Sequence, residues 1–207
     1  MAFEEYDDFE QEKLVKDWIK ANWLTMVTGI VLGLGGVIGI NYWKAQKQEK
    51  RYQMANQYQT FTEVMKLSQL DEAQSILSKM ESDLGSSFYT YEAHLILAKE
   101  YVEKNELEKA AAELKSVIDS KPDQLLTEFV KLRLARVYNA MGKNAQALTL
   151  TNAVSIEEFT SIAKEIQGDA LLAQGDSEKA NAAFKEALEK GEGYSGKKNI
   201  EMKLENS

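Results

Sequence analysis

Two hydrophobic patterns divide the chain. From Ala21 to Trp43 no residue is charged, and this apolar run shows no polar face between Lys20 and Lys44. Beyond Lys44, apolar residues recur every three or four positions among charged ones, which is the period of amphipathic helices. The first pattern predicts a membrane span, and the second predicts a soluble all-α domain.

The apolar run has the length and the flanks of a transmembrane helix, which we place at residues 23–43. A helix needs about 20 apolar residues to cross a hydrocarbon core of ~30 Å. Trp23, Tyr42 and Trp43 stand at its ends, where amphipathic rings favour the headgroup region. The preceding region is long and acidic, and no small-x-small cleavage motif follows the run. The sequence therefore predicts an uncleaved anchor and not a signal peptide.

Charge near the span does not orient it by itself. Three lysines precede the run in the N-terminal tail, residues 1–22, and three lysines with one arginine follow it in residues 44–51. The positive-inside rule counts these cations and largely ignores acids. The two sides differ by one cation, which leans slightly towards a cytoplasmic C-terminal domain.

Glycines gather on one stripe of the predicted span. Gly29 and Gly33 are four residues apart, and Gly36 follows three residues later. Small residues at this spacing let another helix approach closely in lipid, but glycine is also common in membrane helices generally. Both interpretations stay open, and the first makes these three glycines a candidate contact with a partner helix.

A repeating unit organises residues 54–190. In its clearest copy, from Tyr91 to about Gln124, characteristic residues fall at positions 7, 8, 11, 20, 24, 27 and 32 of a 34-residue unit, as in tetratricopeptide repeats. They are Leu97, Ala98, Tyr101, Ala110, Leu114, Val117 and Pro122. Small residues at positions 8 and 20 let two antiparallel helices cross closely, and the large residues fill the space beside them.

Further units start near residues 128 and 161 and, more weakly, near residue 54. The unit at 128 departs from the pattern at Thr151, and the unit at 161 has Gly168 at position 8. Because one hairpin buries only part of its apolar face, neighbouring hairpins must stack. We expect a tetratricopeptide-like α-hairpin repeat array, joined to the span by a helical linker at residues 44–53. Residues 191–207 are expected to form a tail or capping segment, because Gly191, Gly193 and Gly196 interrupt the helix.

Composition limits the chemistry. The net charge of −8 argues against a nucleic-acid partner, which calls for a basic face. The chain has no Cys, and its one His, His94, takes a repeat position that usually packs in the core. No metal-ligand spacing, nucleophile motif or phosphate loop is present. We therefore predict no enzyme, no cofactor, no metal site and no small-molecule substrate.

The concave face is the candidate binding surface. In tetratricopeptide arrays, first-helix positions 2, 5, 9 and 12 usually line that face. The candidates here are Tyr58, Met65, Leu95, Lys99, Val102, Phe129, Leu132, Arg136 and Leu172. The same residues would also suit packing between repeats, so both interpretations stay open. Leu95 and Leu132 hold position 5, so we do not predict a clamp for a terminal carboxylate.

The whole chain also resembles the YfgM family, the ancillary subunits of the bacterial SecYEG translocon. The resemblance rests on the acidic tail and on the VLGLGGVIGINYW stretch of the span. It rests further on KNELEKAAAEL at Lys104–Leu114, KLRLARV at Lys131–Val137 and GDALLAQGD at Gly168–Asp176. The order and spacing of these segments match as well as their composition.

The resemblance implies a single-pass protein of the bacterial inner membrane, with its N-terminus in the cytoplasm and its repeats in the periplasm. It implies association with the SecYEG translocon and with the periplasmic chaperone PpiD, assistance to unfolded exported proteins, and a link to envelope-stress regulation. For the orientation we follow the resemblance and not the positive-inside rule, because the numbers of cations on the two sides of the span differ by only one. A generic membrane-tethered scaffold for another envelope complex is the alternative function.

Overall fold

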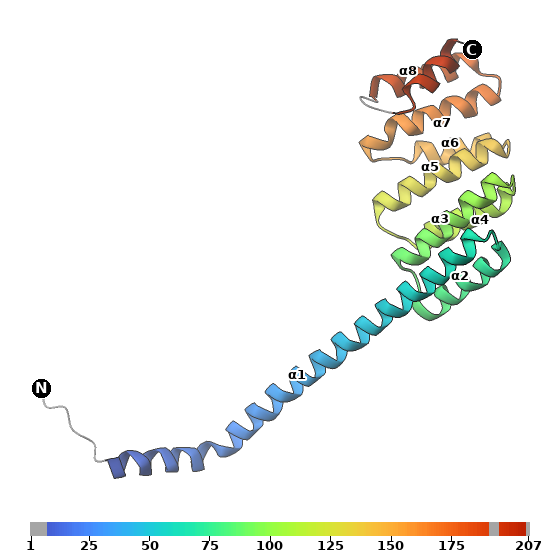
Figure 1. Cartoon of the computed structure of the whole chain (residues 1–207). Coiled ribbons are helices and arrows are strands. Elements are labelled where there is room, and N and C mark those ends of the chain that lie inside the picture. The colour runs from blue at the N-terminus through green and yellow to red at the C-terminus, as the bar shows by residue number, and fades with distance from the viewer. Residues whose placement is uncertain (1–7, 191–194, 206–207) are drawn as a thin grey trace, which may run out of the picture. The chain divides into compact units, whose positions relative to one another are not determined.

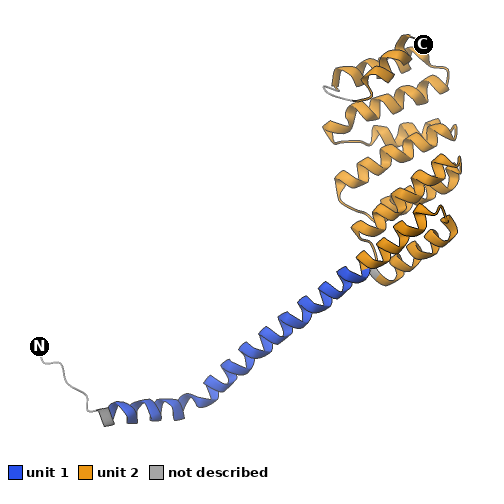
Figure 2. Ribbon diagram, viewed as in Figure 1, with its two compact units in different colours: residues 1–53 blue, residues 54–207 orange. Residues whose placement is uncertain are grey.

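The computed structural model describes residues 8–190 and 195–205, and the elements in these ranges are all helical. Two compact units divide the chain at residues 53 and 54 (Figure 2). The first seven residues of the acidic tail lie outside the described residues, and so do Gly191 and Gly193, two of the glycines expected to interrupt the helix. The described part of the predicted tail, from Asp8 onward, is helical.

The first unit consists of the N-terminal part of helix α1 (Asp8–Lys66). Among the described residues, α1 is the one helix long and apolar enough to cross a membrane by length and composition. Its apolar side chains between Trp23 and Trp43 are exposed, and the described part of the protein buries none of them. A buried core helix is therefore excluded. The helix runs without a break through residues 44–53, so this segment continues the candidate span.

The second unit is a stack of helical hairpins (Figure 1). The end of α1 pairs with α2, α3 pairs with α4, α5 with α6, and α7 with α8. The bounds are α2 (Leu70–Leu84), α3 (Phe88–Glu103), α4 (Leu107–Asp119), α5 (Gln124–Ala140), α6 (Asn144–Asn152), the 3₁₀ turn η1 (Glu157–Phe159), α7 (Thr160–Ala173), α8 (Ser177–Lys190) and α9 (Lys197–Glu205). This arrangement confirms the all-α repeat array.

The same type of turn ends the first helix of each of the four hairpins. After each first helix one residue has a positive φ, and the next backbone N–H returns to a carbonyl five residues earlier, as in a Schellman turn. In α3, for example, the N–H of Glu106 donates to the carbonyl of Tyr101 at 2.7 Å. The residues with positive φ are Ser68, Asn105, Gly142 and Gly175. Local turn chemistry thus sets the hairpin at the predicted period.

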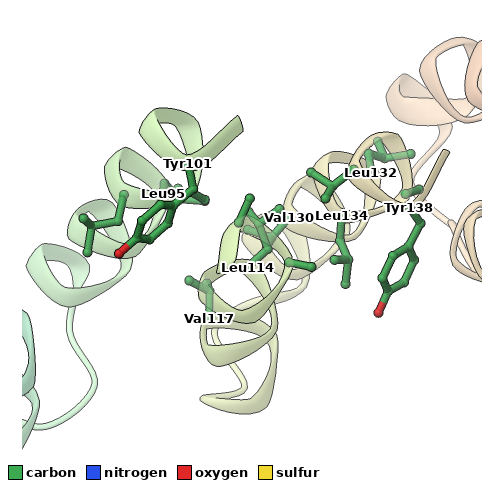
Figure 3. Packing of buried hydrophobic residues seen from close by; sticks show 14 of the residues in the cluster. Leu95, Tyr101, Leu114, Val117, Val130, Leu132, Leu134 and Tyr138 are labelled. Carbon is green, nitrogen blue, oxygen red and sulfur yellow. The ribbon is translucent and has the colours of Figure 1, made fainter. Parts of the chain in front are cut away.

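The buried residues fall at the repeat positions that the sequence predicts to be buried. Position 20 of the repeat is alanine in all four hairpins, and each of these alanines is fully buried, because second helices cross first helices there. They are Ala73, Ala110, Ala147 and Ala180. Figure 3 shows Leu114 and Val117 of α4 together with Val130 and Leu134 of α5, which belong to the cluster of buried residues that joins neighbouring hairpins. The weakest predicted hairpin, at residue 54, is thereby confirmed, since Val64, Leu77 and Met80 are also buried.

Helix α9 covers the end of the array. Its Ile200 is fully buried with Ala180, Phe184 and Ala187 of α8. One turn further along α9, the Lys203 ammonium lies 3.2 Å from a Glu165 carboxylate oxygen and 2.6 Å from one of Asp169, both on α7. Helix α9 is therefore held on the last hairpin by the apolar contact of Ile200 with α8 and by the ion pairs of Lys203 with two acids of α7.

Candidate protein-binding groove

A groove of about 430 Å³ lies between α3 and α5, with α4 at its floor. It brings together four of the predicted binding residues: Leu95, Lys99, Val102 and Arg136. Its full lining is Leu95, Ala98, Lys99, Val102, Glu103, Leu107, Leu114, Arg133, Arg136, Val137 and Ala140. We call this surface the α3/α5 groove. It arises because α3 and α5 are the first helices of successive repeats and each packs against α4, which leaves a groove between them.

The floor of the groove is apolar and its rim is charged. Leu95, Ala98, Leu114 and Val137 are buried at the floor, whereas Val102 keeps 42% of its surface exposed. A partly exposed aliphatic side chain over a buried apolar floor is a place where another apolar side chain can be buried.

Three cations and one acid stand on the rim. The Lys99 ammonium lies 3.5 Å from a carboxylate oxygen of Glu103, one helical turn further along α3. The Arg133 guanidinium lies over the ring of Phe129, 4.4 Å from its centroid. The Arg136 Nη2 atom lies 3.3 Å from Glu165 Oε2, and that carboxylate is buried. Both arginine heads are thus positioned by a neighbouring side chain.

Several predicted residues lie elsewhere. The Tyr58 ring packs against Tyr89, with 5.2 Å between ring centroids, and Met65 packs against the core of the first hairpin. Leu172 is partly exposed on α7. None of these three lines the α3/α5 groove.

Two predicted residues of α5 serve packing. Leu132 is only 3% exposed, so it has almost no surface to offer a partner. The half-buried Phe129 faces the ring of Phe159, with 6.5 Å between centroids, and carries Arg133 on its own ring. For Leu132, packing between repeats is the interpretation that the structure supports. Arg133 was not among the predicted residues, although it lies three positions before Arg136 on the same helix.

His94 is buried, as predicted, but its surroundings are polar. Its Nδ1 atom lies 2.6 Å from Glu113 Oε2, and its Nε2 atom lies 3.0 Å from Glu81 Oε1. Burial alone lowers the pKa of the imidazole, but the hydrogen bonds to Glu113 and Glu81 outweigh it and raise the pKa. A protonated ring donates to both carboxylates. His94 therefore links α2, α3 and α4 inside the first two hairpins and takes no part in the groove.

The three glycines of the predicted helix contact face open space. A Cβ atom built on Gly29, Gly33 or Gly36 would meet nothing within 4 Å. Within the described residues, no contact therefore requires glycine at these three positions.

Comparisons with known proteins agree with this architecture. A family model described as a tetratricopeptide repeat-like domain matches residues 16–207. An ancillary SecYEG translocon subunit of Haemophilus influenzae is 29% identical over 191 residues, covering 92% of this chain and 93% of that protein. The ancillary SecYEG translocon subunit of Escherichia coli is 28% identical over 200 residues, covering 95% of each. The resemblance to this group of proteins is thus confirmed.

A solved structure supports the fold alone. The crystal structure of MamA protein superposes with a TM-score of 0.53 at 23% sequence identity, covering 66% of this chain and 72% of that one.

Proposed function

The chain belongs to the tetratricopeptide repeat-like family, and we propose that it is a membrane-anchored, non-enzymatic accessory subunit of the SecYEG translocon. The observation that carries the proposal is the similarity to ancillary SecYEG translocon subunits, which extends over 92% and 95% of the chain and includes most of the candidate span. The hairpin array supports it, because stacked repeats provide extended surfaces for protein partners.

The two units divide the work in this proposal. The candidate span associates with a translocon helix through Gly29, Gly33 and Gly36, because close backbone packing at small residues drives association in lipid. The repeats engage exported chains, together with a PpiD-like membrane-anchored chaperone, through the α3/α5 groove. The N-terminus is cytoplasmic and the repeats are periplasmic. A link to envelope-stress regulation would follow from contact with unfolded exported proteins.

Orientation is tested by protease accessibility. With the repeats in the periplasm, protease added to intact spheroplasts should digest the chain beyond residue 54 and leave a fragment that contains the span. The control is a cytoplasmic protein, which must stay intact. Protection of the repeats until the inner membrane is opened would contradict the proposal.

The division of work is tested by affinity capture in mild detergent. Gly33→Leu with Gly36→Leu should lower recovery of translocon subunits, because bulky side chains hold the partner helix away while leucine still suits the bilayer. Val102→Gln should lower recovery of the chaperone or of exported chains about fivefold, as expected for a loss of ~1 kcal/mol of apolar burial.

Leu125→Gln is the matched control, since Leu125 is 61% exposed and does not line the groove. Leu132 is unsuitable for this purpose because a polar residue at so buried a position would unfold the domain. If both test variants lose the same partners equally, the division of work is wrong. Recovery of a different envelope complex in place of translocon subunits would favour the generic scaffold.

A further inference from the structure

We propose that the α3/α5 groove selects polypeptide segments in which acidic residues stand next to large apolar ones. This inference rests on the proposed function and deepens it, because it names the chemistry of the chains that the repeats hold. The partner is an extended or unfolded segment rich in Asp or Glu and in Leu, Ile, Val or Phe.

The charge of the groove is opposite to that of the protein. The whole chain has a net charge of −8, and residues 52–207 hold 25 acids against 18 bases. Among the lining residues the balance reverses, with Lys99, Arg133 and Arg136 against the single acid Glu103. An acidic segment is therefore repelled by much of the domain and attracted at the groove, which concentrates the encounter there.

The arginines of the rim are suited to carboxylates. A guanidinium presents five N–H donors in a planar fork, which matches the two oxygens of a carboxylate. The Arg133 guanidinium lies 4.4 Å from the centroid of the Phe129 ring, and Arg136 Nη2 lies 3.3 Å from Oε2 of the buried Glu165. Because both heads are already positioned, binding a carboxylate costs little of their conformational freedom.

The third cation is more loosely held. Lys99 and Glu103 form an exposed pair on one helix, and such pairs contribute little to stability. A ligand carboxylate can therefore compete with Glu103 for the ammonium group.

The floor supplies the apolar half of the specificity. Val102 stands partly exposed above Ala98, Leu114 and Val137, and the rim cations lie within the same set of lining residues. A ligand side chain buried there releases water from both surfaces. An acid without apolar neighbours would use the rim alone, where single charge pairs in water contribute little. Segments flanked by Lys or Arg would meet like charge.

The test measures peptide binding to the full chain in detergent micelles by fluorescence anisotropy. Three labelled peptides of equal length are compared. The first alternates Leu with Glu, the second has Lys in place of Glu, and the third has Ser in place of Leu. At low salt we expect the Leu–Glu peptide to bind at least ~10-fold tighter than either of the others. Its advantage over the Leu–Lys peptide should shrink with added salt, since salt screens exposed charges.

Two double variants test whether the cations of the groove rim cause the preference for the acidic peptide. Lys99→Gln with Arg133→Gln should reduce the preference for Leu–Glu over Leu–Lys to within about twofold, because rim charge then nearly cancels. Lys79→Gln with Lys185→Gln is the matched control, since both lysines are exposed and lie outside the groove. It should leave the preference unchanged. Circular dichroism checks that each variant is folded.

Two results would overturn the inference in distinguishable ways. Equal binding of the acidic and basic peptides, both weakened by Val102→Gln, would refute the charge preference and leave the proposed function standing. Failure of all three peptides to bind, with Val102→Gln capturing every partner normally, would remove the groove from the proposed function as well.

Discussion

Gly168→Ala is expected to destabilise the repeat domain on the order of 2 kcal/mol, although alanine is the better helix former. Gly168 lies within α7, where it faces the ring of Phe184 on α8. A Cβ atom there would lie 2.3 Å from Phe184 Cε1 and 2.5 Å from Cδ1. Phe184 is fully buried against Ile200 of α9, so its ring has no free space to enter. The two helices must separate or the ring must leave its rotamer.

Two effects of opposite sign compete in this substitution. Alanine gains ~1 kcal/mol over glycine in a helix interior. Overpacking a close crossing costs ~1–3 kcal/mol and occasionally more, and contacts this short lie at the severe end. Urea unfolding followed by circular dichroism measures the balance. A gain of stability from Gly168→Ala would show that α7 and α8 do not cross as closely as described.

A double-mutant cycle identifies the cause. Phe184→Leu removes the ring atoms that a new Cβ would meet. Gly168→Ala should therefore cost less in the Phe184→Leu background than alone, and the coupling should exceed the few tenths of a kcal/mol seen for independent sites. Strict additivity would mean that the ring is not the obstacle.

Glu128→Gln is expected to cost about 2–3 kcal/mol, because a buried carboxylate there serves several donors at once. Glu128 of α5 is 4% exposed. It accepts hydrogen bonds from the Ser155 hydroxyl at 2.6 Å and from the backbone N–H groups of Ser155 and Ile156 at 3.1 and 2.8 Å. It thereby holds the segment between α6 and η1. A glutamine has one acceptor oxygen, and its amide would face a donor.

The pH dependence gives this prediction a second readout. Burial raises the pKa of Glu128, but the hydrogen bonds from Ser155, Ile156 and Gln124 outweigh it and lower the pKa to about 2. A group with a lowered pKa stabilises the folded state above its unfolded pKa, and this contribution is lost as the pH falls towards the folded value. The wild-type advantage over Glu128→Gln should therefore be full at pH 7 and shrink between about pH 4.5 and pH 2.

The matched control is Glu158→Gln, an exposed acid of η1 on the same stretch of chain. It should change stability by less than ~0.5 kcal/mol at every pH. An advantage of wild type over Glu128→Gln that is constant from pH 7 to pH 2 would show that Glu128 is not held as the ionised acceptor.

The sequence by itself determined the features that depend on local pattern. The candidate span follows from a run with no charge, and the hairpins follow from a helical period interrupted by residues that adopt positive φ, such as Gly142 and Gly175. Position 20 was identified as buried in every repeat because a close helix crossing admits little more than a methyl group. These features need no knowledge of distant contacts, since propensity and turn chemistry act within a few residues.

Only the tertiary structure decided which residues of a helix face remain accessible. Leu132 at position 5 and Val102 at position 12 were both candidates for the concave face, yet Leu132 is buried and Val102 lines the α3/α5 groove. The contacts of His94 with Glu113 and of Glu128 with Ser155 join residues 19 and 27 positions apart. A one-dimensional period fixes the direction in which a side chain points from its own helix. Whether another helix or water meets it depends on how successive hairpins rotate and approach, and that is set by the packing of all their side chains together.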